Sequence, residues 1–159
     1  MIRLKKRESI KELPMIKINY EINIGMNIHI SDDLNYKISL SSYDPLIIDV
    51  DEEGRPRLME ILWPLDRWEK KILTPPLKYK KERVFLEEND FEDLIFRSNN
   101  EKSILHITVK TSKRPQEHIQ IADKIILDIS KDNYLVGVWI TDIPKELWRK
   151  QIIDLTTCS

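Results

Sequence analysis

The feature that most constrains the fold of this chain is a segment that occurs twice. The stretch IIDVDEEGRPRLMEI, which begins at Ile47, aligns without a gap with ILDISKDNYLVGVWI, which begins at Ile126. Downstream, PLDRWEKKI from Pro64 resembles PKELWRKQI from Pro144 after a one-residue insertion. Self-similarity of this kind predicts one supersecondary unit that is present in two tandem copies.

A second pattern precedes the first copy. From Ile16 to Ile30 every even position is apolar, and every odd position between them is polar or Gly. A period of two predicts β-structure with one face buried and one face in solvent. The run is longer than an average strand. Either residues 25–27 form a turn that pairs Ile24 with Ile28, or the glycine of this triplet is a bulge in one bent strand.

Each copy contains a three-residue hairpin loop, at 52–54 in the first and at 131–133 in the second. The last position of such a loop needs a left-handed backbone, which Gly adopts most easily and Asn next. Gly54 and Asn133 occupy this position. Two different residues that meet one backbone requirement therefore support the alignment.

A proline follows each hairpin and predicts the start of a short helix, because its missing N–H has no partner in a first helical turn. The expected helices cover 64–72 and 144–152, with Trp68 and Trp148 packed in the core. We therefore predict a β-rich α+β protein of two tandem repeats, each a small antiparallel sheet with a short helix, arranged as a pseudo-dimer. The expected divisions are a first repeat over 1–72, a linker over 73–82 and a second repeat over 83–159.

Composition narrows the function only by exclusion. The 159 residues carry a formal net charge of −1, so global charge gives no reason to expect a nucleic acid or an anionic membrane as partner. Cys158 is the only cysteine, which excludes a disulfide framework and a Cys-rich zinc site. No signal peptide and no apolar run of membrane-spanning length are found. We expect a cytoplasmic protein of prokaryotic type without a cofactor.

The stretch IADKIILDISKDNYLVGVWI, from Ile121, resembles a family of short bacterial and archaeal proteins called domain of unknown function 2283. Residues 126–129 and 137–140 match its strand and its return strand. The first copy has Leu58 where the family has Gly, and the second has Trp139 where the family has Glu. The resemblance implies a β-hairpin fold that tends to dimerise and implies no activity.

Two histidines and two aspartates are the candidates for a metal or acid–base site. IHIS at Ile28 resembles LHIT at Leu105, which places His29 on His106, while the gapless alignment places Asp49 on Asp128. A pseudo-two-fold would bring these side chains together. The alternative is that they are solvated strand residues, with Arg57 as the cross-strand partner of Asp49.

Aromatic and basic residues supply the other candidates. Trp63, Trp139 and Tyr134 are the predicted contacts with a protein partner, since aromatic residues are enriched in interface hot spots. A basic cluster with an interleaved tyrosine would contact a phosphate backbone, or it is a solvated linker. This cluster consists of Lys78, Tyr79, Lys80, Lys81 and Arg83.

The leading functional hypothesis is a non-enzymatic module that binds another protein, for example an inhibitor of immunity or antitoxin type. It acts as a monomeric pseudo-dimer or as a homodimer. The first alternative is nucleic-acid binding through 78–83, and the second is a metal-dependent enzyme that uses the His and Asp pairs. The chain has no phosphate-binding glycine loop and no nucleophile elbow, so the enzyme hypothesis has the least support.

Overall fold

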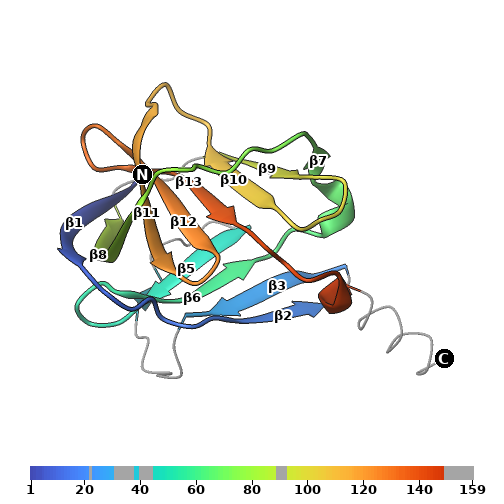
Figure 1. Ribbon diagram of the computed structural model, residues 1–159, viewed down its shortest axis with the longest axis horizontal. Helices are drawn as coiled ribbons and strands as arrows, with labels where there is room; N and C mark the ends of the chain where they lie inside the picture. The colour runs from blue at the N-terminus through green and yellow to red at the C-terminus, as the bar shows by residue number, and fades with distance from the viewer. Residues whose placement is uncertain (22, 31–37, 40–44, 89–92, 149–159) are drawn as a thin grey trace.

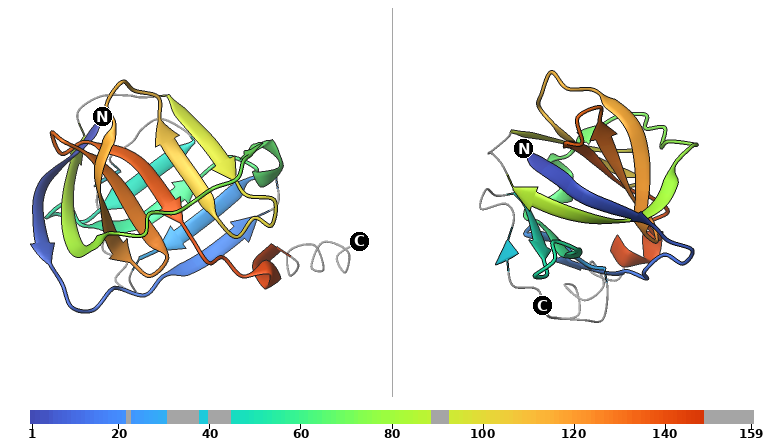
Figure 2. Two further views of the ribbon diagram at one scale, coloured as in Figure 1. Left: turned by 45° about the horizontal axis from the view of Figure 1, so that its top comes forward. Right: turned by 90° about the vertical axis from the view of Figure 1, so that its left-hand side faces the viewer.

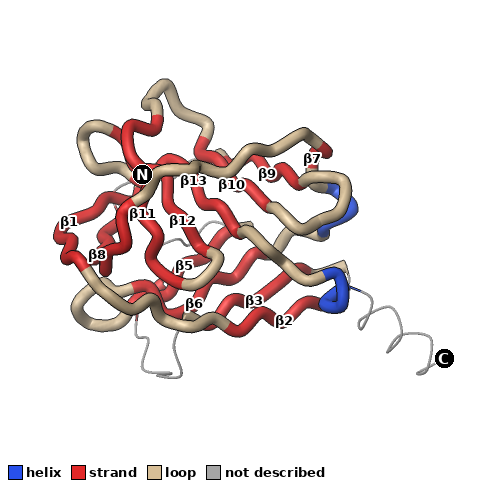
Figure 3. Tube along the Cα trace, in the orientation of Figure 1, coloured by secondary structure: helices blue, strands red, loops and turns tan. Residues whose placement is uncertain are grey.

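The computed structural model describes residues 1–21, 23–30, 38–39, 45–88 and 93–148. These residues form two β-sheets that lie one above the other (Figures 1 and 2). The fold is β-rich, and the helical structure in the described ranges is limited to short turns (Figure 3).

The larger sheet has eight strands, whose neighbours are antiparallel except in the pairs β8–β11 and β7–β9. In spatial order its strands are β1 (Ile2–Ser9), β8 (Lys80–Glu88), β11 (Pro115–Ala122), β12 (Ile125–Ser130), β13 (Leu135–Ile140), β10 (Leu105–Val109), β9 (Leu94–Ser98) and β7 (Glu69–Lys70).

The smaller sheet has five antiparallel strands. In spatial order they are β2 (Lys17–Glu21), β3 (Gly25–His29), β6 (Pro56–Ile61), β5 (Leu46–Val50) and β4 (Ile38–Ser39).

One hydrophobic core fills the space between the sheets, because each strand turns alternate apolar side chains toward the other layer. The smaller sheet contributes Ile28 and Met59, and the larger sheet contributes Leu127 and Ile140, all fully or almost fully buried. Strands β12 and β13 are buried along their whole length, so their outer faces are covered as well.

The order β2-β3-β6-β5-β4 in the smaller sheet has the same connectivity as the order β9-β10-β13-β12-β11 within the larger one. In both sets, the second strand along the chain pairs with the fifth, namely β3 with β6 and β10 with β13. The registers also agree, since Met59 lies opposite Ile28 and Val138 lies opposite Ile107. The two strand sets are called the first set (β2–β6) and the second set (β9–β13) below.

The hairpin loops confirm the backbone that the sequence predicts. Gly54 and Asn133 both have positive φ angles, 97° and 67°, and the N–H of each donates to the carbonyl oxygen of the residue three positions earlier. Each hairpin also has a β-bulge close to its loop. The strand register shifts between Asp49 and Val50 in the first set and between Asp128 and Ile129 in the second.

The turn of the first hairpin was predicted at the wrong place. Neither a turn at 25–27 nor a bent strand is present, because β2 and β3 pair with Glu21 opposite Gly25. The turn therefore lies before Gly25, where Asn23 has a φ of 69°. Asn tolerates this backbone, and a Cβ at Gly25 would lie 1.9 Å from the carbonyl oxygen of Ile61, so Gly25 is needed inside the sheet.

The prediction of a helix over 64–72 is also wrong. Only Leu65–Arg67 form a 3-10 turn, and the chain is extended again at Trp68 (φ −72°, ψ 138°). The Trp68 indole donates to the carbonyl oxygen of Trp63 at 2.9 Å, and the chain then forms β7 beside β9. Residues 145–148 are helical, and the rest of the second predicted helix lies outside the described residues. Trp68 and Trp148 are buried in the core, as predicted.

The expected linker at 73–82 does not separate two sheets. Strands β1 and β7 precede it in the chain and belong to the larger sheet, and its last residues form the start of β8. The connection 71–79, called the strap below, runs from β7 at one edge of this sheet to β8 near the other. It crosses the outer face of the sheet in two views (Figures 1 and 2).

Candidate functional site

A buried carboxylate is the centre of a polar cluster on the larger sheet. Asp128 on β12 is 3% exposed. One oxygen lies 2.9 Å from Nε2 of His106, and the other lies 2.7 Å from Nδ1 of His118. The indole Nε1 of Trp139 lies 3.0 and 3.1 Å from the two oxygens. Three side chains from three other strands therefore meet at one carboxylate, and these four residues are called the Asp128 cluster.

Strand order explains how the Asp128 cluster forms. His118 lies directly opposite Asp128 on β11, and Gly137 lies directly opposite it on β13. A Cβ at Gly137 would lie 2.3 Å from Oδ2 of Asp128. The missing side chain therefore gives the carboxylate room to extend over β13 and reach His106 on β10.

Aromatic stacking fixes the orientation of one imidazole. The rings of His106 and Trp139 are nearly parallel, at 12°, with centroids 3.6 Å apart. Because a carboxylate only accepts hydrogen bonds, Nε2 of His106 and Nδ1 of His118 carry the protons in these contacts. The second nitrogen of each ring then faces away from Asp128. The contacts with Asp128 therefore fix the orientation of both imidazole rings.

The predicted site of two His and two Asp is divided between the sheets. His106 and Asp128 meet, but His29 on β3 and Asp49 on β5 both lie opposite Leu58 in the smaller sheet. The predicted equivalence of the two histidines is wrong: His29 pairs with Leu58, whereas His106 pairs with Trp139. Within the described ranges, no group of three or more His, Cys, Asp or Glu side chains is arranged to hold a metal ion.

The candidate aromatic contacts have different environments. Trp139 is 7% exposed and bonded to Asp128, so the expectation that it is an exposed contact is wrong. Trp63 is half-buried and stacks on Phe96 with centroids 5.8 Å apart. Tyr134 is half-buried with the ammonium of Lys113 over its ring at 4.7 Å. A partner could therefore contact only the exposed parts of the Trp63 and Tyr134 side chains.

The predicted basic segment lies at the end of the strap and the start of β8. All five of its side chains are exposed. Arg83 differs from the others because it borders a cleft between the sheets, with Arg55 and Arg57 on the opposite side.

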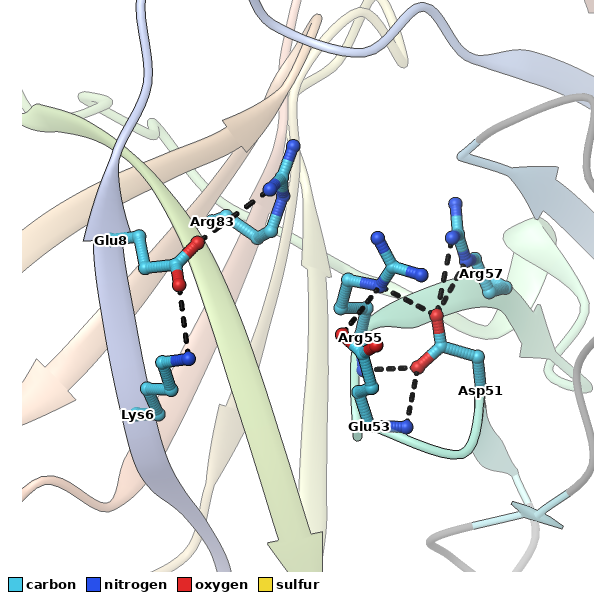
Figure 4. Close-up of polar contacts among 7 residues, drawn as sticks. All are labelled: Lys6, Glu8, Asp51, Glu53, Arg55, Arg57 and Arg83. Carbon is cyan, nitrogen blue, oxygen red and sulfur yellow. Dashed lines mark hydrogen bonds and ion pairs between the residues drawn. The ribbon is translucent and has the colours of Figure 1, made fainter.

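A second buried carboxylate lies in the β5–β6 hairpin (Figure 4). Asp51 accepts hydrogen bonds from the backbone N–H groups of Glu53 and Arg55 and from the guanidinium groups of Arg55 and Arg57. Burial alone would raise the pKa of Asp51. The hydrogen bonds to the charged form outweigh it and hold the pKa of this carboxyl below its usual range. Asp51 forms an ion pair with Arg55 across the hairpin, and Arg57, the bulged residue of β6, also bonds Asp51.

A third group of charges connects β1, β8 and β11. Arg7 donates to both Glu82 and Glu117. The hydrogen bond from Arg7 lowers the pKa of Glu117, and the same contacts raise the pKa of Arg7. These ion pairs connect β1 with its neighbour β8 and with β11, the next strand of the larger sheet.

Sequence reasoning missed His118 and Gly137. The sequence does contain a signal for Gly137. The alignment pairs it with Leu58, and a glycine inside a strand indicates that another group approaches the backbone closely. His118 becomes a cluster member only through the pairing of β11 with β12, which periodicity does not specify.

The chain matches no protein-family profile and no curated protein. The resemblance to domain of unknown function 2283 therefore stays a prediction. In the part of the chain that the structure describes, no helix has the length and apolar character needed to cross a bilayer.

Proposed function

We propose that this protein is a non-enzymatic binding module that docks on another protein through its strap, residues 71–79. The observation that carries this proposal is the exposure of two large aliphatic side chains on the strap. Ile72 is 99% exposed and Leu77 is 92% exposed. Both lie on the strap, and large apolar side chains exposed to solvent are candidate contact points for a partner.

The strap is held in a shape that favours docking. It is anchored by β7 at one end and by β8 at the other. Leu73, Pro75 and Pro76 are half-buried, while Ile72 and Leu77 project outward. The two prolines restrict the backbone, so a partner orders few additional torsions on binding.

The charges around the strap indicate the chemistry of the partner. Lys71 and Lys78 lie within the strap, and Lys70, Lys80 and Lys81 flank it. A complementary surface has apolar pockets for Ile72 and Leu77 with acidic residues at its rim. Grooves that accept proline-stiffened extended segments have this form. An inhibitor of immunity or antitoxin type is one concrete version of such a module.

Capture from a lysate with matched variants tests this proposal. The tagged protein is compared with the double variant Ile72→Ser/Leu77→Ser, and Met15→Ser serves as control because Met15 is also 74% exposed but lies outside the strap. A stoichiometric protein that survives nuclease, binds the control and is lost from the double variant supports the proposal. Equal capture by the double variant contradicts it.

Nucleic-acid binding is the outcome that would replace protein docking. The exposed side chains of Lys78, Tyr79, Lys80 and Lys81 favour it. Binding of this kind is nuclease-sensitive. Its affinity falls steeply as the salt concentration rises, because each phosphate contact releases about one counterion. It weakens when Lys78, Lys80 and Lys81 are replaced by Ala, whereas Ile72→Ser/Leu77→Ser leaves it unchanged.

An acid–base enzyme is a second candidate because of the Asp128 cluster. The hydrogen bonds at 2.9 and 2.7 Å orient two imidazoles on one carboxylate. The three described cavities are lined by other residues. A ligand screen by imidazole NMR tests this candidate: a compound that shifts both His106 and His118 supports it, and unchanged signals for all compounds contradict it.

We also propose that the two strand sets are tandem copies that pack as a pseudo-dimer. Their common strand order, loop backbone and bulge position support this origin. If so, two fragments divided within the strap should associate when co-expressed, because β1 pairs with β8 and β7 pairs with β9. Fragments that fold but stay apart would contradict a pseudo-dimer.

A further inference from the structure

Strand β2 is an open and regular edge of the smaller sheet. It pairs with β3 on one side through five opposed residue pairs, without a register shift. In the described part of the chain, no strand pairs with its other side (Figure 1). Alternate residues of an antiparallel strand turn their backbone N–H and C=O groups toward opposite neighbours. The open side of β2 therefore presents a row of backbone groups to which another strand can bond.

The other sheet edges are less suited to strand addition. In the described ranges, β4 and β7 are only two residues long. Strand β1 has three consecutive basic residues at 5–7 and a register shift between Leu4 and Lys6. The N–H of Leu4 also donates to the carbonyl oxygen of Asn133 at 2.8 Å. Like charges and irregular backbone oppose pairing at an edge, so β2 is the edge that favours it.

The charged side chains of β2 are self-complementary. Lys17 and Glu21 are exposed on its outer face, and neither has an ion pair within the residues that the structure describes. The residues opposite them on β3 are His29 and Gly25, so no carboxylate or ammonium group of β3 competes for either charge. Two antiparallel copies of β2 that are centred on Asn19 place Lys17 of each copy opposite Glu21 of the other. A shift by two residues would place Lys17 or Glu21 opposite Asn19 instead, so charge selects one register.

Apolar side chains support the same register. On the inner face of β2, Tyr20 is buried in the core and Ile18 is half-buried. The register centred on Asn19 places Ile18 of one copy opposite Tyr20 of the other, so the exposed part of Ile18 becomes covered. Met15 and Ile24 lie beyond the two ends of β2 and are 74% and 53% exposed. The same register brings Met15 of one copy toward Ile24 of the other.

We propose that β2 is the interface of a homodimer, in which two copies of the chain pair β2 with β2 antiparallel about a two-fold axis at Asn19. The five-stranded sheets of the two copies then form one continuous sheet. Two-fold symmetry makes every contact occur twice, so both pairs of Lys17 with Glu21 form together. The edge is only five residues long, and interfaces of small area are weak, so dimerisation depends on concentration. The strap is not part of this interface, so loss of the dimer and loss of a docking partner are separate results.

Sedimentation velocity over a concentration series tests the proposal on the full-length protein. Wild type is compared with Lys17→Glu and with Glu21→Lys, each of which replaces two attractive pairs by two repulsive ones. We expect either variant to weaken dimerisation about tenfold. Lys131→Glu is the matched control, because it makes the same charge change at an exposed lysine in the loop between β12 and β13. It should leave dimerisation unchanged, as should Ile72→Ser/Leu77→Ser.

Mixing the two charge variants tests the register itself. Lys17→Glu has two acidic side chains at these positions and Glu21→Lys has two basic ones, so the mixture should form a heterodimer more readily than either variant dimerises alone. The double variant Lys17→Glu/Glu21→Lys restores both attractive pairs and should dimerise like wild type.

Three results would overturn the proposal. The first is a wild type that stays monomeric up to about 1 mM. The second is a dimer that neither charge variant weakens, which would place the interface elsewhere. The third is a monomeric wild type that captures a different protein from a lysate and loses it with both charge variants, which would assign the β2 edge to a foreign strand.

Discussion

The two strand sets share one strand order but place different side chains at corresponding positions. In the second set Gly137 lies between Asp128 and Thr108, and in the first set Leu58 lies between Asp49 and His29. Where the middle strand has no side chain, a carboxylate extends over it and gathers two histidines and a tryptophan. Where the middle strand has a leucine, this path is occupied. One missing side chain therefore lets Asp128 extend across β13, whereas Leu58 occupies the corresponding position in the first set.

The largest expected effect is the loss of Asp128. Asp128→Ala should lower the free energy of unfolding by about 3–5 kcal/mol, because a buried, hydrogen-bonded group leaves its partners unsatisfied. Urea unfolding measures this change. Asp132→Ala removes an exposed carboxylate from the neighbouring loop and should have little effect. Equal losses for the two variants would contradict a special role for Asp128.

The first set should show the opposite requirement at the corresponding position. Leu58 is buried, so Leu58→Ala should cost about 2–5 kcal/mol through lost burial and a cavity. The same unfolding experiment measures it. Phe, Met or Ile at this position should cost less than Ala, and a neutral Leu58→Ala would show that the first set does not depend on a side chain there.

A smaller effect distinguishes the hairpin loops. Asp51 Oδ1 accepts the N–H of Arg55, and Ser130 Oγ accepts the N–H of Tyr134, both at 3.0 Å. Only the Asp51 contact is charged. Asp51→Ser should cost about 1.5–3 kcal/mol at neutral pH, the contribution of hydrogen bonds to a charged group.

The cost of Asp51→Ser should depend on pH. The folded-state pKa of Asp51 lies below its ordinary value, so its contribution is complete above the ordinary pKa and disappears as the pH falls through the folded-state pKa. Unfolding measured from neutral to acid pH should show the two curves converging. Ser130→Ala, the comparison variant, should cost about 1 kcal/mol at neutral pH. The Ser130 hydroxyl also donates to Asp132 and helps to lower the pKa of that carboxyl, so this cost should decrease at acid pH as well, but less than that of Asp51→Ser. A constant gap between wild type and Asp51→Ser would contradict the charged role.

Particular elements show what the sequence can and cannot specify. The hairpin loops were predictable, because Gly54 and Asn133 meet a local backbone requirement. The helix at 64–72 was not, because the pairing of β7 with β9 and the bond from Trp68 to Trp63 override a local helix signal. The placement of β1 in the larger sheet depends on contacts with β8 far along the chain.

The candidate site shows the same limit. Asp128 and His106 were identifiable as candidates, because both interrupt apolar runs. Their partner His118 was not, because β11 and β12 have to be paired before it lies beside Asp128. Trp139 was expected in solvent, but the space beside Gly137 lets Asp128 bind its indole.

The most direct test of this account is a double-mutant cycle between Gly137 and Asp128. Gly137→Ala in the wild-type background should cost about 1–3 kcal/mol, because its Cβ would overlap Oδ2 of Asp128. In the Asp128→Ala background this clash is removed, so the same substitution should cost much less, and the two changes should be strongly non-additive. Equal costs in both backgrounds would contradict the claim that the glycine makes room for the carboxylate.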